Sequence, residues 1–244
     1  MFVMADFRIL KAADSALVIE FGSTIDRKIS DRVLALAETI EQAKLPGVTE
    51  VIATFRSLSI NYDSLVTTGH ELEQAVHAFV NQSTQASGGK RLWQIPACYE
   101  PEFAPDIEEI AKAAKLSVEE VVSLHSDTHY HVYMIGFVPG FPYMGDVPEK
   151  LRFPRRSDPR MRVPPGSLAI ATSMTAVYPY ESPGGWHLIG TTPVRFFDAA
   201  SARGALLGPG DAVRFNPVAR AEFERIKLAV QRNDYVPDSV EIAA

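Results

Sequence analysis

Glycine and proline concentrate in one stretch of this chain, residues 136–190, and this feature constrains the fold more than any other. The stretch holds 7 of the 15 glycines and 9 of the 17 prolines, in 55 of the 244 residues. Glycine permits positive φ and close backbone approach, whereas proline fixes φ and removes a hydrogen-bond donor. Alternation of the two predicts stiff loops of defined shape, and the simplest interpretation is that they are tight turns of a β-rich fold.

Three segments within this stretch combine glycine and proline with aromatic residues or arginines. They are Gly136–Gly145 (GFVPGFPYMG), Pro154–Ser167 (PRRSDPRMRVPPGS) and Tyr178–Gly190 (YPYESPGGWHLIG). Aromatic side chains are suited to wall a pocket, and arginines are bidentate donors for carboxylate, carbonate or phosphate. The alternative for each arginine is a solvated charged face, with partners such as Glu149 and Asp158. The candidates are Phe137, Phe141, Tyr143, Trp186, Arg155, Arg156, Arg160 and Arg162.

The first 82 residues predict a small two-layer α/β unit in the order strand, strand, helix, strand, strand, helix. Strands are expected at 7–10, 17–21, 48–55 and 57–63. The first helix is indicated by apolar residues at spacings of 4, 3 and 4, which fall on one helix face. Those residues are Ile29, Val33, Leu36 and Ile40. The second helix opens with a capping box, Thr68 and Glu71. Its expected buried face holds Leu72, Ala75, Val76 and Phe79.

A change of composition divides the chain after this unit. Residues 83–90 are small, polar and glycine-bearing, which is typical of a flexible connection. We therefore expect an N-terminal domain at 1–83, a linker at 84–90 and a second domain at 91–244. The second domain is expected to begin with a strand at 91–99 and two helices, the first starting at Pro105 and the second capped by Ser117 and Glu120.

From residue 130 onward the pattern changes to short apolar or alternating runs separated by glycine and proline. These runs predict strands, and strands of this kind suggest an antiparallel sheet or barrel. An amphipathic run at 218–230 predicts a final helix on the outside. The expected strands are 130–135, 168–172, 186–189, 194–197 and 212–215.

Charge and cysteine content exclude several classes of protein. The net charge is −6, from 24 basic and 30 acidic residues, which argues against nucleic acid or an anionic membrane as a whole-surface partner. The single cysteine, Cys98, excludes an intrachain disulfide and a cysteine-based zinc cage. The N-terminus lacks the pattern of a signal peptide, and no apolar run has the length of a membrane span. We expect a soluble cytoplasmic protein.

Familiar catalytic motifs are absent from the sequence. It has no Gly-x4-Gly-Lys-Ser/Thr phosphate loop, no Gly-x-Gly-x-x-Gly after a strand, no Gly-x-Ser-x-Gly elbow and no His-Glu-x-x-His zinc helix. A self-sufficient ATPase, dehydrogenase, hydrolase-fold esterase or zinc protease is therefore not expected.

Three histidines and the cysteine are further candidates for chemistry. His125, His129 and His131 offer a metal-ligand spacing, but we favour a structural role, in which His125 ends a helix where a cation is stabilised. Cys98 follows apolar residues without a local basic partner, which indicates a small buried side chain rather than a catalytic thiol. We expect no metal site.

The three glycine- and proline-rich segments resemble one known family. Gly136-Phe-x-Pro-Gly-Phe-x-Tyr-x-Gly145, Pro154-Arg-Arg-x-x-Pro-Arg-x-x-Val-Pro-x-Gly-Ser167 and Ser182-Pro-Gly-Gly-Trp-x-x-Ile-Gly-x-Thr-Pro193 are similar to motifs of the family that contains the B-type subunit of 5-oxoprolinase. The family also contains Kip-type sensor-kinase inhibitors and subunit 1 of the allophanate hydrolase or urea-carboxylase carboxyltransferase type. The resemblance covers nearly the whole chain.

The resemblance implies an α+β fold, with a small two-layer α/β N-terminal domain followed by a cyclophilin-like antiparallel β-barrel. It implies a subunit of an ATP-dependent 5-oxoprolinase, inactive alone, that cleaves 5-oxo-L-proline, a small amide, to L-glutamate. The implied partners are a homologous cyclophilin-like subunit of the C type and a third subunit of the A type. ATP is bound by the complex, with Mg²⁺ accompanying it.

Coupling to ATP is expected to activate the amide oxygen, a step that needs cationic and backbone donors around developing negative charge. Arg155 and Arg160 are the candidates for this catalytic role, helped by the amides of Gly184 and Gly185. The expected substrate-binding residues are Phe137, Gly140, Phe141, Tyr143, Gly166, Ser167, Tyr178, Gly184, Gly185 and Trp186.

One segment departs from the family pattern. Where relatives commonly have Gly-Gly-x-Gln-Thr-Gly-Ile-Tyr-Pro, this chain has Ala171-Thr-Ser-Met-Thr-Ala-Val-Tyr-Pro179. A methionine at position 174 lacks the donor and acceptor of a glutamine amide. If that glutamine contacts substrate in relatives, the substrate differs here, or the chain serves as another member of the family.

Three alternative functions remain open at this point. One is half of a biotin-dependent carboxyltransferase or allophanate hydrolase that acts on urea or a similar amide, with the biotin carrier on another chain. Another is a Kip-type inhibitor that binds a sensor histidine kinase through a surface patch. A prolyl isomerase is suggested only by the barrel, and fold alone does not establish function.

Overall fold

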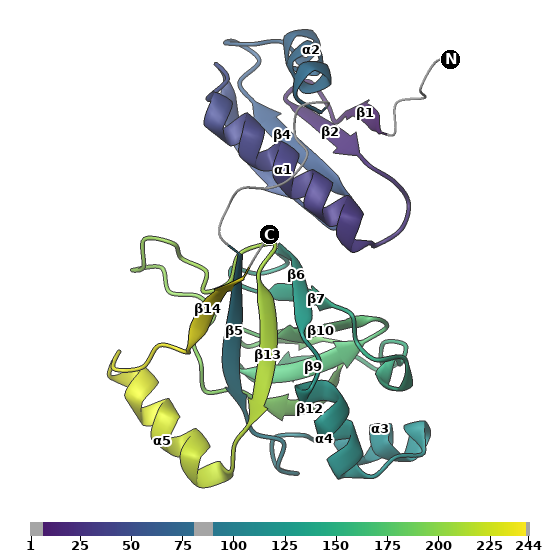
Figure 1. Ribbon diagram of the computed structural model, residues 1–244, viewed down its shortest axis with the longest axis vertical. Coiled ribbons are helices and arrows are strands. Elements are labelled where there is room, and N and C mark those ends of the chain that lie inside the picture. Colours follow the sequence, from purple (N-terminus) through teal and green to yellow (C-terminus); the bar gives the residue numbers. More distant parts are fainter. Residues whose placement is uncertain (1–6, 81–89, 243–244) are drawn as a thin grey trace. The chain divides into compact units, whose positions relative to one another are not determined.

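The computed structural model describes residues 7–80 and 90–242, and these divide into two compact units (Figure 1). The boundary lies between Lys90 and Arg91, and the second unit extends to Ile242. The expected linker at 84–90 lies outside the described residues except for Lys90, which begins the strand β5 (Lys90–Ala97).

The first unit is a four-stranded antiparallel sheet in the order β1-β2-β4-β3 with two helices. Its elements are β1 (Arg8–Lys11), β2 (Ala16–Glu20), α1 (Arg27–Ala43), β3 (Val48–Ala53), β4 (Ser57–Tyr62) and α2 (Gly69–Val80). Alternate residues of β2 and β4 point to one face, as the period of two in a strand requires. They are buried together with the apolar faces of both helices, so the predicted two-layer arrangement is confirmed. The core includes Leu17, Ile19, Leu58, Ile60, Val33, Leu36, Ile40, Leu72 and Val76.

Local signals set the ends of both helices in this unit. The Asp26 carboxylate caps α1 by accepting hydrogen bonds from the backbone N–H groups of Lys28 and Ile29 at 2.8 and 3.3 Å. The predicted capping box of α2 is present, because the Thr68 hydroxyl accepts from the Glu71 N–H and the Glu71 carboxylate accepts from the Thr68 N–H. The capping box predicted from the sequence therefore correctly located the start of α2.

The second unit is built on an eight-stranded mixed sheet in the order β12-β9-β10-β7-β6-β13-β5-β14. Most neighbouring strands are antiparallel, but β13 runs parallel to β5, so the expectation of a wholly antiparallel sheet is wrong at this pair. The strands of the sheet are β5 (Lys90–Ala97), β6 (Tyr130–Ile135), β7 (Pro142–Gly145), β9 (Ser167–Ala171), β10 (Met174–Val177), β12 (His187–Thr191), β13 (Ala212–Pro217) and β14 (Ser239–Ile242).

Strands that stand far apart in the order of the sheet meet again at one end. Cys98, directly after β5, pairs with Thr191 at the end of β12 through two backbone hydrogen bonds of 2.8 and 2.9 Å. The apolar core of this unit lies between the strands and helices, with Ile95, Tyr130 and Phe215 at its centre. The parallel pairing of β5 and β13 is made possible by the long connection between them, which carries most of the sheet.

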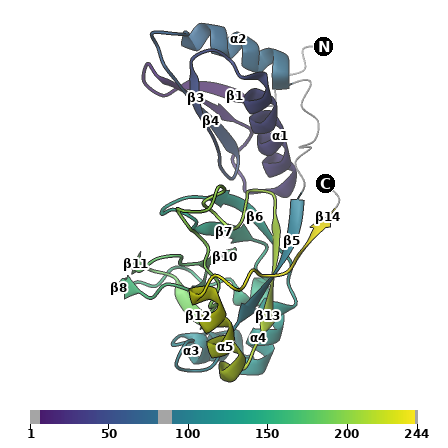
Figure 2. The ribbon, with the colours of Figure 1, turned by 90° about the vertical axis from the view of Figure 1, so that its left-hand side faces the viewer.

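The remaining elements flank this sheet. Figure 2 shows β8 and β11 as a separate two-stranded ribbon that projects beside the larger sheet. The helix α4 begins at the predicted capping box, in which Ser117 and Glu120 bond reciprocally. These elements are α3 (Ile107–Ala114), α4 (Val118–Ser126), the 3-10 turn η1 (Glu149–Leu151), β8 (Arg160–Val163), β11 (Ser182–Gly184) and α5 (Arg220–Gln231).

Residues 194–197 do not form the predicted strand. Phe197 makes only an isolated bridge with Ala205, and the Asp198 carboxylate accepts the N–H of Ala200 at 2.9 Å, which turns the chain into a loop. The apolar composition of the segment instead serves burial, since Val194 and Phe196 belong to the core. Composition alone therefore did not distinguish a buried loop from a strand.

Candidate functional site

Four of the predicted aromatic residues lie together in the second unit. The Phe141 ring centroid is 5.0 Å from that of Tyr143, 5.1 Å from Tyr178 and 6.1 Å from Trp186. Phe141 directly precedes β7 and Tyr143 lies within it, Tyr178 follows β10, and Trp186 precedes β12. The structure therefore gathers side chains from two of the three predicted segments into one cluster, which we call the aromatic wall. Edge-to-face packing of this kind stabilises a fixed arrangement of rings.

Phe137 lies at the exposed margin of the aromatic wall. Its ring is 5.5 Å from Phe141, its side chain is 61% exposed, and its φ is +71°. A residue with a β-carbon is disfavoured at such a φ, so the surrounding loop holds a strained backbone here. This conformation presents a large apolar side chain to solvent.

Tyr178 is a buried member of the wall, 2% exposed, and packs against the central Phe141 ring. Its burial raises the pKa of the phenol to about 12, while the positive charge of Arg155 acts in the opposite direction. The backbone of Gly184 lies directly against its hydroxyl, and a Cβ on that glycine would overlap the oxygen. Tyr178 therefore remains a neutral phenol, and Gly184 is required for the close approach of β11.

Arg155 and Trp186 form a cation–π pair at the edge of the wall. The Arg155 guanidinium carbon is 5.9 Å from the centroid of the Trp186 ring. Burial raises the pKa of the Tyr143 phenol, and the positive charge of Arg155 opposes this effect. The structure therefore brings one of the two predicted catalytic arginines to the aromatic residues.

Arg160, the second predicted catalytic arginine, is held by a carboxylate that sequence reasoning missed. Arg160 Nη2 donates to Asp106 Oδ1 at 2.7 Å, and Arg156 Nη1 donates to the same oxygen at 3.0 Å. The other oxygen, Oδ2, accepts the backbone N–H of Leu188 at 2.6 Å. Asp106 lies 50 and 54 residues from the two arginines, so no local motif signals the contact. Of the partners expected for the arginines, Asp158 contributes only its backbone carbonyl, to Arg156.

Three buried polar side-chain atoms near these residues have no hydrogen-bond partner among the described residues. They are Arg160 Nη1, Ser182 Oγ and His187 Nδ1. Ser182 and Gly184 lie on β11, which pairs with β8, where Arg160 stands opposite Gly184. A buried polar atom without a partner carries a penalty of roughly 1–3 kcal/mol, so a water molecule or a ligand is needed to supply the missing bonds.

The remaining predicted residues, Gly140, Gly166 and Ser167, pack closely against neighbouring loops and strands. Gly140 has a φ of +77°, and a Cβ there would stand 2.6 Å from the Cβ of Phe197. Gly166, with a φ of +83°, lies against the Thr192 carbonyl, and Ser167 is buried opposite Thr191 in the sheet. Both are joined to the aromatic wall through the backbone, because the Gly166 N–H donates to the Tyr178 carbonyl at 2.7 Å and the Tyr178 N–H donates to the Ser167 carbonyl at 3.0 Å. Gly140 directly precedes Phe141 in the sequence.

Gly185 connects the ribbon to the arginine segment. Its carbonyl accepts the backbone N–H of Arg156 at 2.7 Å.

Met174, at the position where relatives commonly have glutamine, is 5% exposed in β10. The thioether is therefore a buried apolar group, and the structure gives no polar substitute for the amide at that residue.

The structure contradicts the role predicted for His125 and confirms the burial predicted for Cys98. His125 is completely buried, with Nδ1 2.8 Å from the Tyr99 hydroxyl and Nε2 3.0 Å from the Thr175 hydroxyl. Burial lowers its pKa to about 3, so the expected cation at a helix end is wrong: the imidazole is neutral. Cys98 is buried as predicted, and burial raises the pKa of its thiol. In the parts of the chain that the structure describes, no three metal-ligating side chains gather in one place.

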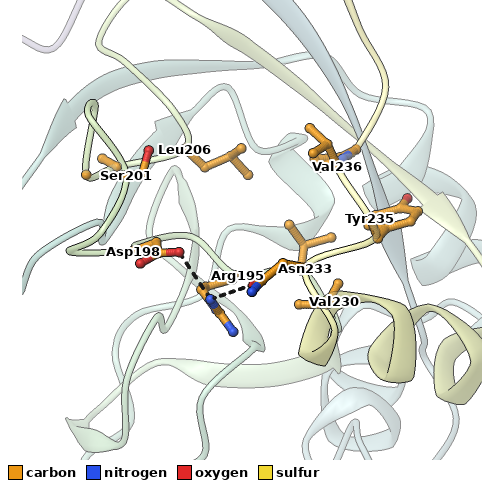
Figure 3. Close-up of a pocket in the computed structure, with 12 residues that line it drawn as sticks. Arg195, Asp198, Ser201, Leu206, Val230, Asn233, Tyr235 and Val236 are labelled. Atoms are coloured by element: carbon orange, nitrogen blue, oxygen red, sulfur yellow. Dashed lines mark hydrogen bonds and ion pairs between the residues drawn. The ribbon is translucent and has the colours of Figure 1, made fainter.

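A separate hollow of about 350 Å³ lies between the loop at 194–206 and the segment after α5. Figure 3 shows Arg195 on its floor between Asp198 and Asn233, to which Arg195 Nη1 donates at 3.2 and 3.4 Å. Apolar side chains such as Val230 and Tyr235 complete the lining. None of the site residues predicted from the sequence lines this hollow, and its arginine is already paired.

Within residues 7–80 and 90–242, no helix has the length and apolarity to cross a membrane.

Comparisons with known proteins identify the family of this chain. The family described as carboxyltransferase domain, subdomain C and D, matches residues 7–207. The 5-oxoprolinase B subunit of Bacillus subtilis (strain 168) is 37% identical over 233 residues, which cover 91% of this chain and 97% of that protein. The crystal structure of TTHA0988 superposes with a TM-score of 0.77 at 34% identity. That match covers 84% of this chain but 40% of TTHA0988, so the chain spans less than half of that relative.

A more distant structure shares the fold. The Kluyveromyces lactis urea carboxylase superposes with a TM-score of 0.80 at 20% identity, over 97% of this chain and 24% of the enzyme. At this identity the likeness concerns the fold alone. Together, the matched family and the Bacillus relative establish that this chain is a homologue of the 5-oxoprolinase B subunit and belongs to the carboxyltransferase subdomain C and D family.

Proposed function

We propose that this chain is a subunit of an ATP-dependent 5-oxoprolinase complex, which cleaves 5-oxo-L-proline to L-glutamate. The observation that carries this proposal is the 37% identity with the 5-oxoprolinase B subunit over nearly the whole of both chains. The described residues add an aromatic wall and cationic donors of the kind that an acidic amide substrate requires. The absence of a phosphate-loop sequence fits a subunit that relies on partners for ATP binding.

We propose two domains, at 1–83 and 91–244 with a linker at 84–90, of which the second is a cyclophilin-like barrel. The pairing of Cys98 with Thr191 supports closure, because it joins the strand β12 at one edge of the sheet order to the continuation of β5 near the other edge. A closed sheet leaves no long unpaired edge to associate with other chains.

In this proposal, the amide oxygen of the lactam attacks the γ-phosphorus of ATP and ADP leaves; water then adds to the activated carbon, the C–N bond of the ring breaks, and phosphate is released with L-glutamate. Negative charge is spread over the oxygens of the transferred phosphoryl group, and Arg155 and Arg160 are proposed as the catalytic cations that stabilise it, with the amides of Gly184 and Gly185 as additional donors. ATP with Mg²⁺ is bound by the assembled complex. The residues proposed to bind substrate are Phe137, Gly140, Phe141, Tyr143, Gly166, Ser167, Tyr178, Gly184, Gly185 and Trp186.

The proposed partners are a homologous cyclophilin-like subunit of the C type and a third subunit of the A type. Substrate recognition by this chain is expected to be partial, because Phe137, at the margin of the largely buried aromatic wall, leaves one side of the site exposed to solvent. A partner that covers this side would exclude water from the reacting groups.

The experiment that tests the function measures glutamate release from 5-oxoproline and ATP, using this chain expressed together with its candidate partner subunits. Release that requires this chain supports the proposal. An assembled complex that releases no glutamate would overturn it, and the same complex should then be supplied with urea-like amides. The variant Arg160→Ala is expected to abolish the activity while the melting temperature of the chain stays within a few degrees of the wild type.

A further inference from the structure

Asp106 is a buried carboxylate whose contacts do not fit an ordinary helix cap. It is the residue that precedes α3, where an aspartate usually accepts hydrogen bonds from the first turn, yet its side chain makes no capping bond. Instead it is 3% exposed and is directed toward Arg156, Arg160 and Leu188. The carboxylate is therefore used to hold the arginine segment and the start of β12 together.

The two arginines at this carboxylate are unevenly paired. Two guanidinium groups share Asp106 Oδ1, and the nearest further carboxylate, Glu109, is 3.8 Å from Arg156 with its side chain 70% exposed. Arg160 forms its ion pair through Nη2, whereas its buried Nη1 has no partner among the described residues. Glu109 therefore supplies a second, exposed negative charge on the side of Arg156, whereas Arg160 has, in the described part of the chain, only its share of Asp106 and an unpartnered Nη1, to which an anionic group could bind.

The position of Arg160 in the β8–β11 ribbon indicates which groups lie near its Nη1 atom. Arg160 stands opposite Gly184 in the β8–β11 pair, and Gly184 lies against the Tyr178 hydroxyl of the aromatic wall. Ser182, two residues earlier on β11, has a second buried and unpartnered polar atom among the residues that the structure describes. The guanidinium is thus held on one side by Asp106, and its positive charge acts on the Tyr178 phenol, so it lies near the aromatic wall.

We infer that Asp106 is a positioning residue, which fixes the Arg160 guanidinium so that Nη1, with the Ser182 hydroxyl, donates to an anionic oxygen of the bound substrate. This inference rests on the proposed function, since the oxygen is identified as belonging to an acidic amide. Asp106 itself does not touch the substrate. Its effect passes through Arg160, because a fixed guanidinium loses little further freedom when the oxygen binds.

A double-mutant cycle in the assembled complex tests the inference. Asp106→Asn keeps the size of the side chain but weakens the clamp, and we expect it to lower kcat/KM for 5-oxoproline by roughly 10- to 100-fold. Arg160→Met removes the donor, and the double variant is expected to be no less active than Arg160→Met alone. Losses that multiply would overturn the inference, because independent residues give additive free energies. Glu222→Gln, which breaks the Arg225 pair on α5, is the matched control and should leave activity unchanged.

A second variant keeps the inference testable if Asp106→Asn does not fold. Arg160→Lys keeps a cation for the Asp106 pair but has no second nitrogen at the place of Nη1. If Arg160 serves only to pair with Asp106, Arg160→Lys will retain full activity, and the inference is wrong. We expect it to fold like the wild type and to lose activity by roughly 10-fold or more, since a planar guanidinium fork and an ammonium are not equivalent.

A measurement without turnover separates this inference from the proposed function. NMR of the whole chain, labelled with ¹⁵N at arginine, reports whether the Arg160 guanidinium rotates slowly. Slow rotation in the wild type that becomes fast in Asp106→Asn supports the clamp, even if the complex proves inactive on 5-oxoproline. Equal rotation in both would overturn the positioning role, even if the complex releases glutamate.

Discussion

The hydroxyl of Tyr178 occupies the space in which a side chain at Gly184 would stand. Tyr178 follows β10 and Gly184 ends β11, so this contact ties the projecting ribbon to the aromatic wall. The contact depends on the absence of a Cβ, because the tyrosine is almost completely buried and has no free space in which to move. Glycine at this position is thus explained by close approach and not by backbone torsion.

Gly184→Ala is therefore expected to displace Tyr178 or the ribbon. Overpacking of this kind destabilises a protein by roughly 1–3 kcal/mol, and the shift of the ribbon should also reduce catalysis. Gly185→Ala is the matched control for stability, since a Cβ there would meet Pro159 at an ordinary 3.6 Å. Urea unfolding of both variants provides the comparison. Equal stabilities for the two would mean that the Tyr178 contact relaxes without cost.

Arg155→Ala is expected to lower kcat in the assembled complex by about 100-fold, as loss of a donor to a developing oxyanion does. KM should change less, because the aromatic wall remains. Arg225→Ala removes a surface arginine on α5 and serves as the control. If Arg155→Ala raises KM while kcat stays unchanged, Arg155 binds the substrate without acting in the chemical step.

The buried His125 predicts an acid-sensitive stability. Its pKa is about 3 in the folded chain and near 6.5 when unfolded, so the unfolded state binds a proton first as the pH falls. The stability from the neutral imidazole is fully present above pH 6.5 and is lost as the pH falls toward 3. Between about pH 7 and pH 5 this group alone should remove about 2 kcal/mol from the free energy of unfolding.

The variant His125→Phe tests this origin. It is expected to be less stable than the wild type at about pH 7, because the Tyr99 hydroxyl loses its partner, but to lack the wild-type decline on acidification. Urea unfolding of the full chain at several pH values gives both quantities. A decline of the same size in wild type and variant would assign the acid sensitivity to other groups.

The capping box of α4 predicts a smaller effect. Ser117→Ala removes the hydroxyl that accepts the Glu120 N–H at 3.1 Å and should destabilise the second unit by about 1 kcal/mol. Ser123→Ala, within the same helix, replaces serine by a better helix former and is expected to be neutral or slightly stabilising. Thermal unfolding of the two variants distinguishes the cap from a general effect of serine removal.

The elements that depend on local physics could be predicted from the amino-acid sequence. Apolar residues at helical spacing predicted α1, and the two capping boxes located the starts of α2 and α4, because each signal acts within a few residues of the chain. The glycine and proline pattern marked the segments that build the candidate site, and their motifs indicated the family. Apolar composition gave a wrong strand prediction at 194–197, because a buried segment need not be a strand.

Contacts between groups that are distant in the sequence could not be predicted in this way. Asp106 reaches Arg156 and Arg160 across 50 and 54 residues, and His125 becomes a neutral buried imidazole because Tyr99 and Thr175 enclose it. The parallel pairing of β5 with β13 likewise depends on the path of the whole chain between them. Contacts of this kind arise from the packing of the complete domain, in which burial and electrostatic pairing act between residues with no relationship in the linear sequence.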